Sequence, residues 1–124
     1  MASKWWSVAV DCADPVALGR WWAEVLDYTV VYEASDESVV IAGTQDQPIW
    51  PGLVFVQVPE GKAVKNRLHI DLNPDDQEAV VARLEGLGAK RVDVGQRDVT
   101  WVVLADPEGN EFCVLRARPQ GETA

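Results

Sequence analysis

The chain has 124 residues, 48% of them hydrophobic and 25% charged, which is the composition of a globular domain large enough to bury a core. Its net charge of −9 and its scattered lysines and arginines argue against a nucleic-acid partner. No apolar run approaches the roughly 20 residues of a membrane span and no signal-peptide segment is present, so we expect one cytoplasmic domain over residues 1–124 without membrane contact.

The first half of the chain predicts one helix among four strands. Residues 5–11 alternate and are rich in strand-forming side chains. Asp14 followed by Pro15 predicts an N-cap and the first position of a helix. The apolar face of that helix has helical spacing and consists of Leu18, Trp21, Trp22, Val25 and Leu26. Three further strands are predicted at residues 29–33, 38–42 and 53–58.

The second half predicts the same elements in the same order. Residues 67–72 alternate as a strand, and residues 74–76 open a helix. The buried stripe of this helix is expected to be Val80, Val81, Leu84 and Leu87. Further strands are predicted at residues 90–94, 100–105 and 111–116, with a turn at 106–110 and a frayed tail at 118–124.

The two halves are related by an offset of 62 residues, half the length of the chain. This offset aligns Ser7 with His69, and it aligns Asp14 with Asp76 at the two helix starts. A period of this size indicates two modules, at about residues 4–60 and 64–117, in a single domain. The predicted fold class is α+β: two βαβββ modules that form a curved mixed β-sheet cleft with helices on the outer face.

Strand alternation assigns side chains to two faces. The helix-facing residues are expected to be Trp6, Val8 and Val10 in the first strand and Leu68, Ile70 and Leu72 in the fifth. The opposite faces are polar, and we expect them to line the cleft. The side chains assigned to these faces are Trp5, Ser7, Ala9, Asp11, Phe55, Gln57, Arg67, His69, Asp71, Glu111, Cys113 and Leu115.

Several segments together resemble one known family. They are Asp14-Pro15 with Trp21-Trp22 and Val25-Leu26, then Val58-Pro59-Glu60, Lys65-Asn66-Arg67-Leu68-His69-Ile70-Asp71-Leu72 and Asp106-Pro107-Glu108-Gly109-Asn110-Glu111-Phe112. Over about residues 5–116 the chain resembles the glyoxalase-like subgroup of the vicinal oxygen chelate superfamily, which also includes bleomycin-resistance proteins and dioxygenases. The resemblance implies paired βαβββ modules, a homodimer, and a cleft that in the enzymes holds a divalent metal.

The resemblance also implies metal positions, and most of them carry unusual residues here. They correspond to Ser7, to Gln57 or Phe55, to His69 and to Cys113, and only His69 keeps the usual ligand type. Because one imidazole with an amide and a serine hydroxyl binds divalent ions weakly, no metal cofactor is favoured. If a divalent metal binds, we expect His69, Gln57 and Cys113 to hold it. Both cysteines, Cys12 and Cys113, are expected to stay as thiols.

His69 is the single histidine and the candidate catalytic residue. It could act as a general base oriented by Asp71, or it could be a packed imidazole with a structural partner. Asp71 could instead pair with Arg67. The segment 65–67 could bind an anionic group or could satisfy loop carbonyls.

Six tryptophans are a heavy use of this residue. Trp6, Trp21 and Trp22 are expected in the core. Trp5, Trp50 and Trp101 could form aromatic walls of a pocket for an organic molecule, or they could pack in a dimer interface.

The leading functional hypothesis is a cytoplasmic homodimer whose cleft binds a small organic molecule, as a drug-binding resistance protein does. The expected ligand-binding residues are Trp5, Ser7, Asp11, Trp50, Phe55, Gln57, Arg67, Asp71, Trp101 and Cys113. The alternative is a lyase, isomerase or dioxygenase-like enzyme that uses His69 with a divalent metal. A structural or regulatory domain is a third hypothesis, and the sequence leaves open whether the protein is an enzyme.

Overall fold

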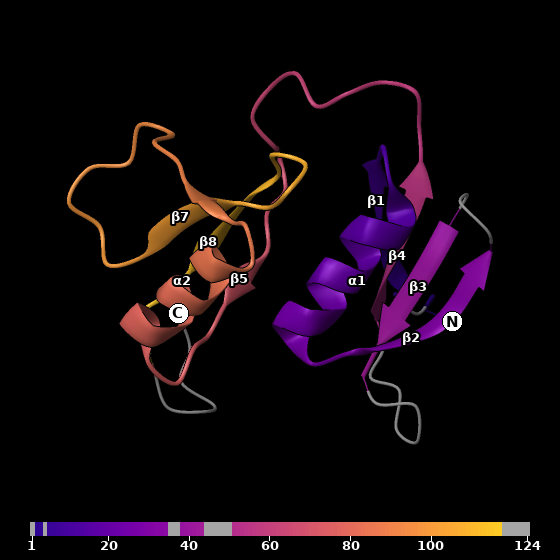
Figure 1. Ribbon diagram of the computed structural model, residues 1–124, viewed down its shortest axis with the longest axis horizontal. Coiled ribbons are helices and arrows are strands. Elements are labelled where there is room, and N and C mark those ends of the chain that lie inside the picture. The colour runs from indigo at the N-terminus through magenta and orange to yellow at the C-terminus, as the bar shows by residue number, and fades with distance from the viewer. Residues whose placement is uncertain (1, 4, 35–37, 44–50, 118–124) are drawn as a thin grey trace. The chain divides into compact units, whose positions relative to one another are not determined.

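The computed structural model describes residues 2–3, 5–34, 38–43 and 51–117 (Figure 1). The chain divides into two compact units, Met1–Gly61 and Lys62–Ala124. Each unit is a βαβββ-like module with one helix and a mixed four-stranded sheet. The predicted α+β class and the duplication of a βαβββ module are therefore confirmed. Trp50 and the predicted tail at 118–124 lie outside the described residues.

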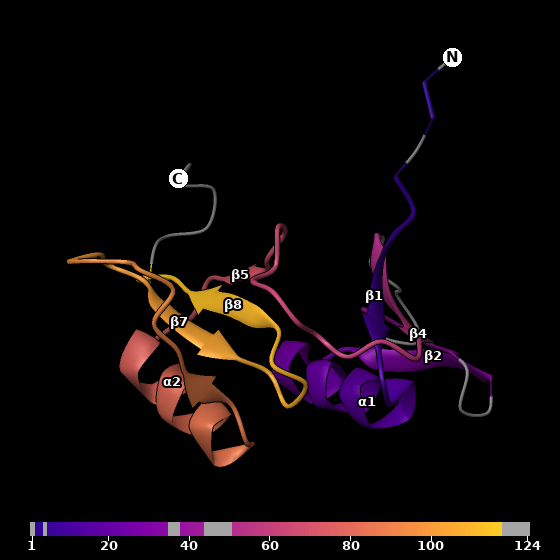
Figure 2. The same ribbon diagram turned by 90° about the horizontal axis from the view of Figure 1, so that it is seen from above.

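Unit one contains β1 (Ser7–Cys12), α1 (Pro15–Leu26), β2 (Thr29–Ala34), β3 (Ser38–Ala42) and β4 (Gly52–Gln57). Its strand order is β1-β4-β3-β2, with β1 parallel to β4 and the other pairs antiparallel. Helix α1 lies along one face of this sheet (Figures 1 and 2). The sheet therefore keeps a second face that α1 does not cover.

Helix α1 begins where the sequence indicated and ends at Leu26, the last residue of its predicted apolar face. Asp14 Oδ1 accepts a hydrogen bond from the backbone N–H of Ala17 at 3.1 Å, and Pro15 occupies the first helical position. Asp27 ends the helix in the left-handed conformation with φ 55°. The predicted N-cap is confirmed.

Phe55 and Gln57 lie on the helix face of the sheet, which corrects the expectation that they share the opposite face with Ser7 and Asp11. In the parallel register Val10 is opposite Phe55 and Cys12 is opposite Gln57, so these pairs point to the same side. Phe55 is fully buried, close to Gly19 of α1. The expectation failed because residues 53–56 are all apolar, and such a run carries no alternation from which to read a face.

Trp6 is also placed differently from the prediction. It precedes β1 and is 60% exposed, so it is not part of the core. Trp22 is buried, as expected, and its ring meets that of Trp21 edge-on with centroids 5.1 Å apart.

Unit two contains β5 (Asp71–Leu72), α2 (Gln77–Gly86), β6 (Lys90–Arg91), β7 (Val102–Ala105) and β8 (Glu111–Val114). Its strand order is β5-β8-β7-β6, and β5 is parallel to β8. Asp76 Oδ1 accepts from the N–H of Ala79 at 3.2 Å, so Asp76 caps α2 as Asp14 caps α1. Neither helix of the described chain is long and apolar enough to cross a membrane.

Strand β5 is shorter than the predicted strand at residues 67–72. Residues 67–70 lie outside it, although the backbone oxygen of Ile70 still accepts a hydrogen bond from the N–H of Cys113 at 2.9 Å. Leu68 is 83% exposed, so the expectation that it packs beneath α2 is wrong. The core of unit two is instead formed by Val81, Leu84, Leu104, Phe112 and Val114.

The predicted turn at residues 106–110 joins β7 to β8. Asp106 is buried, and its Oδ1 accepts hydrogen bonds from the backbone N–H groups of Glu108 and Asn110 at 2.9 and 3.0 Å. Gly109 supplies the positive φ of 88° that this turn requires. The turn thereby sets the pairing of β7 with β8.

Candidate functional site

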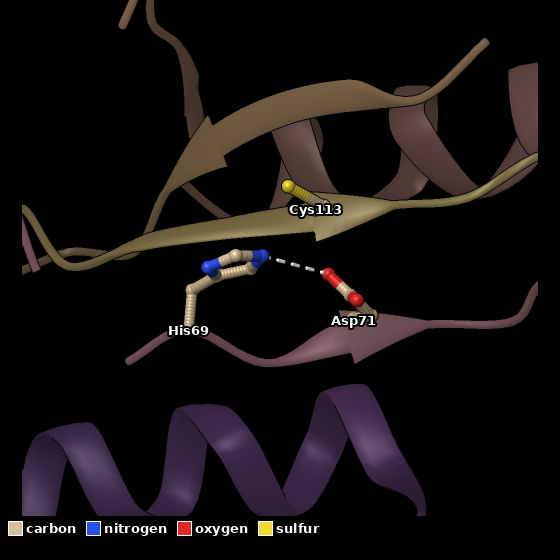
Figure 3. A group of neighbouring side chains, drawn as sticks. All are labelled: His69, Asp71 and Cys113. Atoms are coloured by element: carbon tan, nitrogen blue, oxygen red, sulfur yellow. Dashed lines mark ion pairs between the residues drawn. The ribbon is translucent and has the colours of Figure 1, made fainter. Parts of the chain in front are cut away.

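Three side chains with different donor atoms converge in unit two: His69, Asp71 and Cys113 (Figure 3). Their nitrogen, oxygen and sulfur atoms all lie within 4.8 Å of one another. His69 Nε2 and Asp71 Oδ1 are 3.1 Å apart. Among the described residues, this group is the one cluster whose acidic, imidazole and thiol groups could together hold a metal ion.

Strand pairing brings these residues together. Asp71 of β5 is directly opposite Cys113 of β8 in a parallel register, so both side chains point to the same face. His69 precedes Asp71 by two residues, and its imidazole lies beside the carboxylate on that face (Figure 3). The next residues in the register, Leu72 and Val114, point to the opposite face, and Val114 is fully buried.

The cluster is buried at one end and open at the other. Cys113 is 7% exposed, whereas the side chains of His69 and Asp71 are 42% and 49% exposed. Burial raises the pKa of the Cys113 thiol, and the charge and hydrogen bond of Asp71 raise it further, while the nearby Lys65 ammonium lowers it. Cys113 is therefore protonated at neutral pH in the metal-free protein.

The pairing of His69 with Asp71 also orients the imidazole. The 3.1 Å contact places the Asp71 carboxylate beside Nε2, which leaves Nδ1 as the ring nitrogen without this contact. The group can accept a proton at Nδ1 and leave the resulting charge beside Asp71. This is the arrangement of a general base with an orienting carboxylate.

A second ionic contact holds the segment that leads to His69. Glu111 of β8 accepts a hydrogen bond from Lys62 Nζ at 2.9 Å and one from the backbone N–H of Asn66 at 2.8 Å. Burial alone would raise the pKa of Glu111, but the hydrogen bonds from Asn66 and Lys62 and the charge of Lys62 outweigh it, so the pKa is lowered. Strand alternation predicts Glu111 on this face, but Lys62 is distant in sequence and only the fold brings it beside Glu111.

The other expected site residues are distributed over both units. Ser7 and Asp11 of β1 lie on the face away from Val10, and the backbone oxygen of Ser7 accepts from Trp5 Nε1 at 3.1 Å. Trp5 is 69% exposed.

Gln57 donates from Nε2 to the backbone oxygen of Ala13 at 3.3 Å and is exposed at the end of β4. In unit two, Arg67 is exposed in the bend before His69, and Trp101 precedes β7 with 41% exposure. Of the expected residues, the structure thus unites His69, Asp71 and Cys113 in one place within one unit.

A match to a known protein family shows which family the chain belongs to. Residues 7–115 match the family described as the glyoxalase-like domain. The chain belongs to this family. The family match agrees with the glyoxalase-like resemblance that the sequence motifs indicated. No curated protein sequence is similar enough to this chain to count as a match.

Solved structures share the fold over nearly the whole chain. A possible glyoxalase from Bacillus cereus is 16% identical with a TM-score of 0.68, and the match covers 92% of this chain and 99% of that one. The fosfomycin resistance protein FosX from Listeria monocytogenes is 12% identical with a TM-score of 0.69, over 95% and 94% of the two chains.

A glyoxalase/bleomycin resistance protein/dioxygenase family enzyme from Burkholderia phytofirmans is similar as well. It is 17% identical with a TM-score of 0.63, and the match covers 87% of this chain and 94% of that one. At these identities the likeness establishes the fold alone.

The donors present in the glyoxalase-like protein fit a divalent metal. They differ from the set of His69, Gln57 and Cys113 that the sequence led us to expect. Asp71 supplies a carboxylate that the sequence analysis did not count as a ligand, and it lies beside His69 and opposite Cys113. Gln57, the other ligand that the sequence led us to expect, lies in unit one on the helix face of its sheet. An imidazole, a carboxylate and a thiol are together a donor set that zinc accepts.

Proposed function

We propose that this glyoxalase-like protein binds a small organic molecule on the face of the unit-two sheet that carries His69, Asp71 and Cys113. The observation that carries the proposal is the His69–Asp71 pair, with its 3.1 Å contact and its half-exposed side chains above a buried thiol. An imidazole and a carboxylate that stay open to solvent beside a packed sheet are available to hydrogen-bond a ligand.

The surroundings of the pair offer apolar contact as well. Val103 of β7 is directly opposite Cys113 and is buried, and Trp101, which precedes Val103 by two residues, supplies the exposed apolar surface. Trp101 keeps 41% of its surface exposed and could stack on a flat ligand. Neighbours that are named as fosfomycin or bleomycin resistance proteins make a drug-like ligand a reasonable choice of probe.

The proposal keeps three expectations from the sequence. The protein forms a homodimer, it is located in the cytoplasm, and its two units belong to one domain. In that arrangement Ser7, Asp11 and Trp5 of unit one would contribute further ligand contacts. The drug-binding resistance role is its most specific form.

A second candidate is an enzyme that moves a proton, such as a lyase or an isomerase. The 3.1 Å contact of His69 Nε2 with Asp71 favours it, because Nδ1 is then the ring nitrogen available to accept a proton. The two candidates differ in turnover, since only an enzyme converts the bound molecule.

The single histidine makes the site easy to observe, because an untagged protein has one set of imidazole NMR signals, those of His69. We would titrate histidine-labelled, metal-free protein with fosfomycin, with bleomycin and with a panel of aromatic carboxylic acids. We expect at least one probe to shift the imidazole signals saturably.

Matched variants identify the binding face. Asp71→Asn should weaken binding about tenfold or more, as for the loss of a charged hydrogen bond. Asp75→Asn, at a nearby exposed carboxylate, should leave the affinity unchanged. No response to any probe, or equal loss in both variants, would contradict the proposed site.

A further inference from the structure

The segment that leads to His69 has a charge opposite to that of the chain. Residues 62–70, which we call the basic segment, contain Lys62, Lys65 and Arg67 and no carboxylate side chain. The net charge of the chain is −9, and all 20 of its acidic residues lie outside this segment. The basic segment is therefore a local excess of positive charge in an acidic protein.

Two backbone contacts fix the basic segment beside β8. Glu111 Oε1 accepts a hydrogen bond from the backbone N–H of Asn66 at 2.8 Å, and the backbone oxygen of Ile70 accepts from the N–H of Cys113 at 2.9 Å. The segment therefore runs along β8 from Glu111 to Cys113. Lys65 directly precedes the first contact, and its ammonium is close enough to Cys113 to lower the pKa of that thiol. Lys65 thus belongs to the surroundings of the candidate site.

The two carboxylates of this region already have partners. Glu111 is paired with Lys62 at 2.9 Å, and Asp71 contacts His69 at 3.1 Å. Lys65 is exposed, and its side chain makes no hydrogen bond or ion pair with any residue that the structure describes. An ammonium group that lacks a counter-ion within the described chain is available to bind an anion from solution.

From these contacts we infer that Lys65 binds an anionic group of the organic ligand, while the His69–Asp71 pair binds a hydrogen-bond donor elsewhere on the same molecule. The ligand is thus an organic acid that also carries a hydroxyl or amino group. The inference rests on the proposed function, because it uses the same face of the unit-two sheet. It deepens that function by naming the charge of the ligand.

Opposite charges in the site select the two ends of this ligand. The Asp71 carboxylate accepts hydrogen bonds and repels an anion, so the acidic group of the ligand has to lie away from it. Lys65 has three donors on a flexible stem, and it can meet the anion at a position beyond the His69–Asp71 contact. A neutral analogue of the acid would keep the contact with Asp71 and lose only the contact with Lys65.

The experiment compares two acids with neutral amides of the same shape. The untagged, metal-free full chain is titrated with 4-hydroxybenzoate, with 6-hydroxy-2-naphthoate and with the two corresponding amides. Calorimetry gives the affinities, and the imidazole NMR signals of His69 report the binding face. We expect each acid to bind about threefold to tenfold more tightly than its amide, as for an ionic contact that solvent partly screens. Sodium chloride at about 0.3 M should reduce this preference.

Three lysine variants identify the cation. Lys65→Gln should abolish the preference for the acid and leave the affinity for the amide unchanged, whereas Lys65→Arg should retain the preference because it keeps the charge. Lys90→Gln is the matched control, since Lys90 is also exposed and lies on β6, at the other edge of the unit-two sheet from β5. It removes the same charge and should change neither affinity. Circular dichroism verifies that each variant is folded.

The outcomes separate this inference from the proposed function. If acid and amide bind equally and both shift the His69 signals, the inference fails and the proposed function stands. A preference for the acid that persists in Lys65→Gln, or that Lys90→Gln abolishes equally, also overturns the inference. If the acids bind through Lys65 and leave the His69 signals unchanged, the assignment of Lys65 stands and the proposed function fails. Absence of binding by both acids overturns the inference, whatever the other probes of the proposed function show.

Discussion

Lys62 Nζ lies 2.9 Å from Glu111 Oε2, and both side chains are mostly buried, at 19% and 15% exposure. Glu111 also accepts from the backbone of Asn66, so one carboxylate fixes two points of the segment that leads from Lys62 to His69. This segment contains no strand before β5. Its course toward the cluster therefore depends on side-chain contacts rather than on a β-ladder.

We expect Glu111→Gln to lower the free energy of unfolding near neutral pH by about 1–3 kcal/mol, because it leaves Lys62 without its charged partner. The lowered pKa means that Glu111 adds stability above the ordinary glutamate pKa, and that this stability is lost as the pH falls through its folded-state pKa. Urea unfolding from about pH 7 to about pH 3 should show a smaller acid-dependent loss in the variant. Glu60→Gln, at an exposed carboxylate, is the control, and an equal pH dependence in wild type and Glu111→Gln would contradict the assignment.

The thiol of Cys113 should react slowly with iodoacetamide at neutral pH in chelator-treated protein, because its raised pKa keeps it protonated. Its rate should rise only above the pH at which an ordinary cysteine ionises. Asp71→Asn removes the carboxylate that disfavours the thiolate, so the rate profile should move to lower pH, although burial continues to oppose ionisation. A Cys12→Ser background isolates the reaction, and a profile unaffected by Asp71→Asn would show that the carboxylate does not act on the thiol.

Gly19 of α1 should not tolerate a methyl group. A Cβ there would lie 2.8 Å from Val39 Cγ1 and 3.3 Å from Phe55, two fully buried side chains. Gly19→Ala should therefore cost about 1–3 kcal/mol in thermal or urea unfolding, and Val39→Ala should restore part of the loss in the double variant.

Gly86→Ala in α2 should stabilise the protein rather than destabilise it, because a Cβ at this position would meet no atom within 4 Å. There we expect a gain of about 0.5 kcal/mol from helix propensity. If both glycines responded alike, the packing of α1 on Val39 and Phe55 would be wrong.

Asp106→Ala should destabilise the protein by about 1–3 kcal/mol, because the backbone N–H groups of Glu108 and Asn110 lose the buried carboxylate that accepts from them. Asp98→Ala, at an exposed position, should stay within about 0.5 kcal/mol of wild type. Denaturant midpoints compare the two. A small effect at Asp106 would mean that water replaces the carboxylate and that the turn does not set the β7–β8 register.

The helix starts, the order of the elements and the duplication were determined by the sequence alone. Asp14 and Asp76 cap their helices through backbone groups three residues away, so the signal is local and repeats in both halves. The strand at Ser38–Ala42 begins and ends as predicted for the same reason, because turn-forming residues flank an apolar run. The motifs that these elements carry were enough to indicate the family.

Only the tertiary structure decided which side chains meet. Phe55 and Gln57 were assigned to the wrong face because an unbroken apolar run has no period, and the pairing with Val10 and Cys12 settles its orientation. Asp71 became a partner of Cys113 through a β-pairing between residues far apart in sequence, which no local pattern reports. The candidate site therefore combines His69, which the sequence identified, with an arrangement of oxygen and sulfur donors that depends on the register of two strands.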